Sequence, residues 1–113
     1  MAEGFAVTGF THLVLGVLDG RDPVELLEIL DAEEAETVVC CSPRSPRALP
    51  ASDLADIVRR AGGRPIVVDD VGDAIERVLS LAAPDDIVLV TGSLYTVGDA
   101  RAACRRLGLV ADR

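Results

Sequence analysis

Residues 84–101, PDDIVLVTGSLYTVGDAR, combine the features of a strand, a tight turn and a helix start in one continuous stretch. The run DIVLVT, residues 86–91, is almost entirely apolar or β-branched, which is typical of a strand covered on both faces. Gly92 and Ser93 follow at once, and serine is a preferred N-cap residue. The stretch therefore predicts a buried strand that passes through a turn into a helix.

The same combination occurs three more times along the chain. Each earlier apolar run is followed by apolar residues at helical spacing, and Asp22 stands where it can cap the first helix. The predicted strands are 12–18, 37–41, 65–69 and 86–91, and the predicted helices are 22–32, 50–63, 71–84 and 95–108. Four βα units predict a single domain, 1–113, with a Rossmann-like, open, mostly parallel sheet in a three-layer α/β/α fold.

The charge balance excludes several classes of function. The formal net charge is −8, and all eleven positively charged residues are arginine. Nucleic acids and anionic membranes are attracted by basic surfaces, so we expect neither as a partner. Because lysine is absent, the chain has no Walker lysine and cannot form a Schiff base.

The cysteines and the single histidine do not form a recognisable metal motif. Cys40, Cys41 and Cys104 have no C-x-x-C spacing, and His12 is far from all of them in sequence. We expect no metal site and interpret the cysteines as small core residues in a reducing cytoplasm. The amino-terminal sequence MAEGFAVTGF lacks the basic start and long apolar run of a signal peptide, which also favours a cytoplasmic location.

The carboxyl ends of parallel strands meet at one edge of a sheet, where ligands bind in the following loops. Here that edge brings together Arg21, Arg44, Arg47 and Ser93, next to several helix N-termini. Guanidinium groups and free N–H groups suit a small carboxylate or phosphate. A plainer interpretation remains open, in which the arginines are solvated and the serine only caps a helix.

Sequence motifs for catalysis are absent. The chain contains no P-loop, no G-x-G-x-x-G and no G-x-S-x-G, and His12 lies at the opposite end of its strand from the binding edge. We therefore assign no catalytic residue.

The segments SPRALP (45–50) and TGSLYTVG (91–98), set in four βα units, resemble the carboxyl-terminal domain of folylpolyglutamate synthase/dihydrofolate synthase, a member of the Mur ligase superfamily. The likeness spans residues 1–109. It implies ATP-dependent amide ligation, in which a folate or dihydropteroate carboxylate becomes an acyl phosphate that the amine of L-glutamate attacks. ATP and magnesium would be held by a separate ATPase domain, and none is expected to bind tightly to this chain.

The resemblance also implies roles for individual residues. Ser93 and Arg21 would bind carboxylates of the incoming glutamate, although the family usually has lysine at the position of Arg21. Leu94 and Tyr95 follow Ser93 in the same loop and belong to the implied site. Arg44 and Arg47 would contact either the substrate or the partner domain.

The chain departs from the family at its beginning. The family domain opens with a strand ending in Asp-Gly-Ala-His-Asn-Pro and a helix, and neither is present. We therefore expect a domain truncated at its amino end, inactive alone, with an exposed apolar edge where that strand would lie and a possible homodimer through this edge. Two alternatives remain: an interaction module that docks on a separate ATPase subunit, and a sensor for a small anion.

Overall fold

A computed structural model describes residues 9–20 and 22–108 of the chain. The strands are β1 (Thr11–Leu15), β2 (Thr37–Ser42), β3 (Pro65–Asp70) and β4 (Ile87–Thr91). The helices are α1 (Pro23–Ile29), the short 3-10 helix η1 (Ala32–Glu34), α2 (Ala51–Arg60), α3 (Val71–Leu81) and α4 (Leu94–Arg106). The four predicted βα units are confirmed. Residues 1–8, which make up most of the amino-terminal sequence MAEGFAVTGF, lie outside the described residues.

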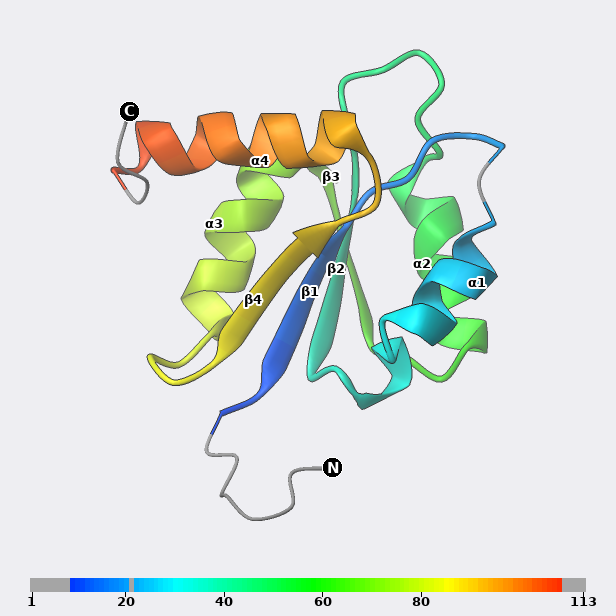
Figure 1. Ribbon diagram of the computed structural model, residues 1–113, viewed down its shortest axis with the longest axis horizontal. Coiled ribbons are helices and arrows are strands. Elements are labelled where there is room, and N and C mark those ends of the chain that lie inside the picture. Colours follow the sequence, from blue (N-terminus) through cyan, green and yellow to red (C-terminus); the bar gives the residue numbers. More distant parts are fainter. Residues whose placement is uncertain (1–8, 21, 109–113) are drawn as a thin grey trace.

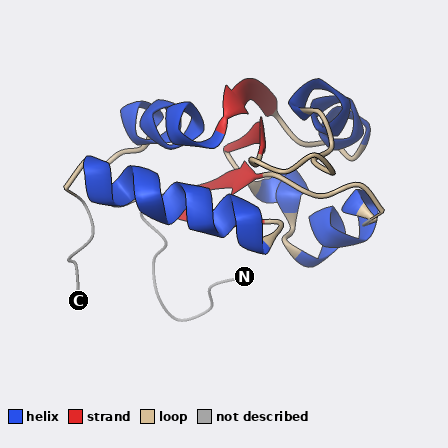
Figure 2. Cartoon of the chain, turned by 90° about the horizontal axis from the view of Figure 1, so that it is seen from above, coloured by secondary structure: helices blue, strands red, loops and turns tan. Residues whose placement is uncertain are grey.

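The sheet has the strand order β3-β2-β1-β4, and all its strand pairs are parallel. α1 and α2 lie on one side of the sheet and α3 and α4 on the other (Figure 1). Seen from above in Figure 2, the strands run between the helices. This arrangement confirms the predicted open, three-layer α/β/α fold.

Two apolar clusters hold the layers together, one on each face of the sheet. Because side chains alternate along a strand, Leu13 and Leu15 of β1 pack toward α1 and α2, whereas Val14 between them packs toward α3 and α4. In β2, Val38 and Val39 divide between the two faces in the same way. The core is thus centred on β1 and β2, whose apolar residues are fully buried.

The outer strands are less covered than the sequence suggested. In β4 the side chain of Ile87 is 63% exposed and that of Leu89 is 43% exposed. Both lie on the face of α1 and α2, since their partners in β1 are Thr11 and Leu13. The expectation of burial on both faces is therefore right for the central strands and wrong for β4, because α1 and α2 do not extend over the edge of the sheet (Figure 1).

The first strand is also shorter than predicted. Pairing of β1 with both neighbours stops at Leu15, and the predicted residues 16–18 leave the sheet. Leu18 instead makes an isolated antiparallel bridge with Ala48, in the loop between β2 and α2. The chain after β1 is thereby tied to a second loop at the carboxyl edge of the sheet.

None of the described helices is long and apolar enough to cross a membrane.

Candidate functional site

The carboxyl edge of the sheet brings together most of the residues predicted to bind a ligand. Arg44 and Arg47 lie in the loop that follows β2, and Ser93 immediately precedes α4, whose first residues are Leu94 and Tyr95. These segments meet at the upper end of the strands in Figure 1. Arg21, the sixth residue of the predicted site, lies outside the described residues.

A close approach of two glycines positions the turn between β4 and α4. Gly92 has φ +126°, a conformation that side-chain-bearing residues rarely adopt, and a Cβ atom on it would overlap the carbonyl oxygen of Gly16. The N–H of Gly16 in turn donates to the carbonyl of Thr91 at 3.3 Å. The start of α4 is therefore held directly against the end of β1.

Three hydroxyl and carbonyl groups then lock the first turn of α4. The buried Thr96 hydroxyl donates to the carbonyl oxygen of Gly16 at 2.8 Å. Because that proton is used, the Ser93 hydroxyl is the donor in its 3.0 Å contact with Thr96 Oγ1. Ser93 Oγ also accepts the Thr96 N–H at 3.1 Å. The predicted N-cap role of Ser93 is confirmed.

Hydrogen bonds of Ser45 and Arg47 hold the loop between β2 and α2 in place. The guanidinium of Arg47 donates to the carbonyl of Asp19 at 3.2 Å, and the N–H of Asp19 donates to the carbonyl of Arg47. The Ser45 hydroxyl accepts the N–H of Arg47 at 3.2 Å. Arg47 therefore joins the loops after β1 and β2, and Ser45 holds a turn within the second of these loops.

Arg44 faces a shallow hollow beside α3 and α4. Its backbone N–H donates to the carboxylate of Asp99 on α4 at 2.9 Å, while its exposed side chain reaches a pocket of about 40 Å³. Asp70, Asp99 and Arg106 also line this pocket, so both signs of charge are present. The guanidinium of Arg44 has no hydrogen bond or ion pair among the described residues and is free to meet a ligand.

The start of α4 presents N–H groups without helical partners at the carboxyl edge. The first N–H groups of a helix lack intrahelical partners and carry a partial positive charge, and in α4 they open beside the exposed Tyr95. In the described part of the chain, no group of three or more His, Cys, Asp or Glu side chains is placed to hold a metal ion. Burial raises the pKa of Cys40 and of Cys41 to about 12, so both stay protonated.

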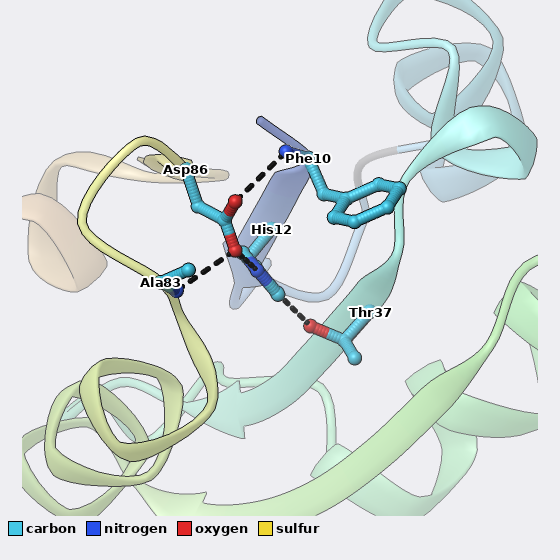
Figure 3. A network of polar contacts seen from close by, with 5 residues as sticks. All are labelled: Phe10, His12, Thr37, Ala83 and Asp86. Carbon is cyan, nitrogen blue, oxygen red and sulfur yellow. Dashed lines mark hydrogen bonds and ion pairs between the residues drawn. The ribbon is translucent and has the colours of Figure 1, made fainter. Parts of the chain in front are cut away.

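A second polar cluster lies at the opposite, amino end of the sheet (Figure 3). His12 Nδ1 lies 2.8 Å from Thr37 Oγ1, and His12 Nε2 lies 2.8 Å from Asp86 Oδ2. The carboxylate of Asp86 also accepts the N–H groups of Phe10 and Ala83, each at 2.9 Å. These N–H groups, followed by His12, lower the pKa of Asp86 to about 2.

The amino-end cluster was not predicted, because it joins residues 74 positions apart that only the pairing of β1 with β4 brings together. His12 is only 2% exposed, so its ring is enclosed by the protein. The cluster joins the beginnings of β1, β2 and β4 and lies at the end of the sheet opposite the carboxyl edge.

Comparisons with known proteins agree with this geometry. The model of the family described as Mur ligase, glutamate ligase domain, matches residues 3–94. A probable bifunctional folylpolyglutamate synthase/dihydropteroate synthase from Haloferax volcanii is 34% identical over 96 residues. That match covers 84% of this chain and 11% of the relative.

Two solved structures are similar in both sequence and fold. Mycobacterium tuberculosis folylpolyglutamate synthase, complexed with ADP and AMPPCP, is 30% identical with a TM-score of 0.74, over 82% of this chain and 23% of that one. A bifunctional folylpolyglutamate synthase/dihydrofolate synthase with Mn, AMPPNP and L-glutamate bound is 28% identical with a TM-score of 0.73, over 88% and 23%. The chain thus spans about a tenth to a quarter of these relatives.

Proposed function

Because this chain belongs to the family of Mur ligase glutamate ligase domains, we propose that it is the glutamate-binding lid of an ATP-dependent folate–glutamate ligase. The observation that carries this proposal is the meeting of the α4 N-terminus with the arginine-bearing β2–α2 loop at one edge of the sheet. Both features favour a carboxylate, and L-glutamate has two.

In the proposed reaction, a carboxylate of folate or dihydropteroate is activated as an acyl phosphate, with ATP and magnesium supplying the phosphoryl chemistry. The amino group of glutamate then attacks the acyl carbon, phosphate leaves, and an amide forms. This chain contributes to the step by holding glutamate, not by transferring a group. A fixed amine close to the acyl carbon lowers the entropic part of the barrier.

One glutamate carboxylate binds at the start of α4. The backbone N–H groups of Leu94 and Tyr95 supply donors, and the Ser93 hydroxyl becomes a further donor when its proton turns from Thr96 Oγ1 to the ligand. The helix is not unwound by this exchange, since Ser93 Oγ still accepts the Thr96 N–H and Thr96 still donates to Gly16. Binding therefore costs one internal hydrogen bond and gains charge-assisted ones.

The arginines supply the remaining positive charge. Arg44 has an exposed guanidinium next to the edge. One N–H group of the Arg47 guanidinium donates to the carbonyl of Asp19, and its other N–H groups remain available to a ligand. Arg21 is proposed as a further carboxylate ligand, in the position where lysine is usual in the family. Arg44 and Arg47 would also lie on the surface that the lid turns toward its ATPase domain, where they can contact that domain.

The nucleotide and the metal are assigned to the rest of the ligase. Among the described residues no cluster of acidic, histidine or cysteine side chains could hold magnesium, and the sequence has no lysine for the phosphates. We therefore propose that the isolated chain binds glutamate without catalysing ligation, and that it works in the cytoplasm, where folate or dihydropteroate is the second substrate.

Calorimetric titration of the chain with L-glutamate tests the proposal. The variant Ser93→Asp keeps a helix cap but places a carboxylate against the ligand, so we expect loss of binding with little loss of stability. Arg44→Ala is expected to weaken binding by about tenfold, the equivalent of roughly 1.4 kcal/mol. Arg77→Ala, an exposed arginine on α3 away from the edge, serves as the matched control and should bind normally.

The same titration separates the alternatives. If Ser93→Asp and Arg44→Ala bind glutamate like the parent, the edge is not the glutamate site and the proposal is wrong. Inorganic phosphate that displaces glutamate from the edge, and binds it more tightly, favours the small-anion sensor instead. The interaction module is supported by the exposed residues Ile87 and Leu89 of β4, which also carry the proposed homodimer.

A further inference from the structure

Asp99 of α4 joins this helix to the loop that follows β2. Its Oδ2 atom accepts the backbone N–H of Arg44 at 2.9 Å, across 55 positions of sequence. Asp99 comes one turn after Thr96, and residues three apart lie on the same face of a helix. Because the Thr96 hydroxyl fixes that face to the end of β1, Asp99 ties the β2–α2 loop to a helix that is itself held in place.

Close packing at Gly16 sets the same three segments against one another. A Cβ atom on Gly16 would lie 2.8 Å from Thr96 Oγ1 and 3.1 Å from Cδ of Pro43. Pro43 is buried and immediately precedes Arg44. The backbone that leads into Arg44 is therefore packed against β1, while the N–H of Arg44 is held by α4.

The bond to Asp99 holds the backbone of Arg44 and leaves its side chain available. Among the described residues, Asp99 forms no ion pair with the Arg44 guanidinium, although both residues line the same pocket of about 40 Å³. Arg44 is exposed, whereas Asp99 is half-buried. A binding group on an ordered backbone loses less conformational entropy when it meets its ligand.

We propose that Asp99 is a positioning residue that fixes the separation between Arg44 and the start of α4, and thereby selects an amino acid with two carboxylates. This inference rests on the proposed function, in which one carboxylate of glutamate binds at the start of α4 and Arg44 supplies charge for the other. Two linked groups gain from two contacts only when the geometry lets both form at once. Asp99 acts through the backbone of Arg44.

The hydrogen bond and the charge of Asp99 have opposite effects on an anionic ligand. The negative charge repels a carboxylate bound nearby, whereas the hydrogen bond holds the loop that attracts it. Asp99→Asn removes the charge and keeps an acceptor for the Arg44 N–H. Asp99→Ala removes both, so the difference between the two variants isolates the hydrogen bond. Alanine is also the better helix former, so weaker binding by Asp99→Ala does not come from loss of α4.

Calorimetric titration with L-glutamate and with L-norvaline, which lacks the side-chain carboxylate, tests the proposal. We expect the parent and Asp99→Asn to prefer glutamate. In Asp99→Ala this preference should fall by about tenfold, with little change in the affinity for norvaline. Glu76→Ala, which removes an exposed acidic residue from α3, is the matched control for the lost charge and should keep the preference of the parent.

The outcomes separate this inference from the function on which it rests. A parent that binds no glutamate overturns the proposed function and this inference with it. A parent that binds glutamate, with Asp99→Ala and Asp99→Asn indistinguishable, overturns this inference alone. Equal losses for glutamate and norvaline in Asp99→Ala show a general loosening of the edge and contradict the selection of a second carboxylate.

Amide hydrogen exchange at Arg44 tests the structural part of the proposal without a ligand. The Arg44 N–H should exchange faster in Asp99→Ala than in the parent, because its acceptor is gone. In Asp99→Asn its exchange should stay close to that of the parent. Exchange that is unchanged in Asp99→Ala would contradict the claim that Asp99 holds this loop.

Discussion

The hydroxyl of Thr96 in α4 donates a 2.8 Å hydrogen bond to the carbonyl oxygen of Gly16, at the end of β1 and eighty positions away in sequence. Through this bond the first turn of α4 is fixed to the central strand of the sheet. The same hydroxyl accepts a hydrogen bond from Ser93, so the residue proposed to bind glutamate is oriented by a buried side chain beneath it.

Thr96→Val is expected to destabilise the fold by about 1–3 kcal/mol, because the buried carbonyl of Gly16 loses its hydrogen-bond donor. Thr96→Ser retains the hydroxyl and should lose less. Urea unfolding of the two variants gives the comparison. If valine proves as stable as serine at this position, the bond to Gly16 does not secure α4.

Gly92→Ala should destabilise the protein by more than 1 kcal/mol, because alanine disfavours φ +126° and its Cβ would overlap Gly16. Gly98, inside α4, provides the matched control, since a Cβ there meets nothing within 4 Å. Gly98→Ala should stabilise by about 0.5–1 kcal/mol through helix propensity. Thermal unfolding of both variants measures the difference, and a tolerated Gly92→Ala would argue against the close approach.

The amino-end cluster predicts a specific dependence of stability on pH. The pKa of Asp86 is lowered from 3.8 to about 2, so folding favours its ionised form. This stabilisation is fully present above about pH 4 and is lost as the pH falls toward 2. Asp86→Asn should therefore be less stable near neutrality. In urea unfolding, its free energy of unfolding should fall less than that of the parent between pH 6 and pH 2.

Asp56→Asn is the control for this pH dependence. Asp56 pairs with Arg59 at 2.9 Å on the surface of α2, where both side chains are more than half exposed, and such pairs contribute little to stability. The free energy of unfolding of Asp56→Asn should depend on pH between 6 and 2 in the same way as that of the parent. An Asp86→Asn variant that also follows the parent would show that the cluster does not stabilise the fold.

The cysteines should differ in reactivity. Burial raises the pKa of Cys40 and Cys41 to about 12, and the thiolate is the reactive form. We expect an aromatic disulfide reagent at pH 8 to label Cys104, which is partly exposed, well before the other two. Labelling of all three at one rate in the folded protein would contradict their burial in the core.

Much of the fold could be predicted from local patterns. Buried runs such as that in β2 differ clearly from the helical spacing that follows them, and the caps at Asp22 and Ser93 appear in the structure as predicted. The ends of β1 and the exposure of β4 could not be predicted. Both depend on which strands are neighbours and how far α1 and α2 reach, and these are properties of the assembled sheet.

The candidate site was predicted in composition but not in contacts. Ser93, Arg44 and Arg47 follow their strands, so their common edge follows from a parallel sheet alone. Two contacts depend on how β1 packs against its neighbours. These are the hydrogen bond of Arg47 to the loop at Asp19 and the position of Thr96 beneath Ser93. The amino-end cluster likewise depends on the pairing of β1 with β4, which no local pattern encodes.

The central claim is that the carboxyl edge binds L-glutamate, and amide NMR of the labelled chain during a glutamate titration tests it most directly. We predict shifts at residues 43–48 and 92–97, with the amides around His12 and Asp86 unchanged at the far end of the sheet. A folded spectrum in which glutamate moves no resonance at this edge, or moves those of another surface instead, would contradict the claim.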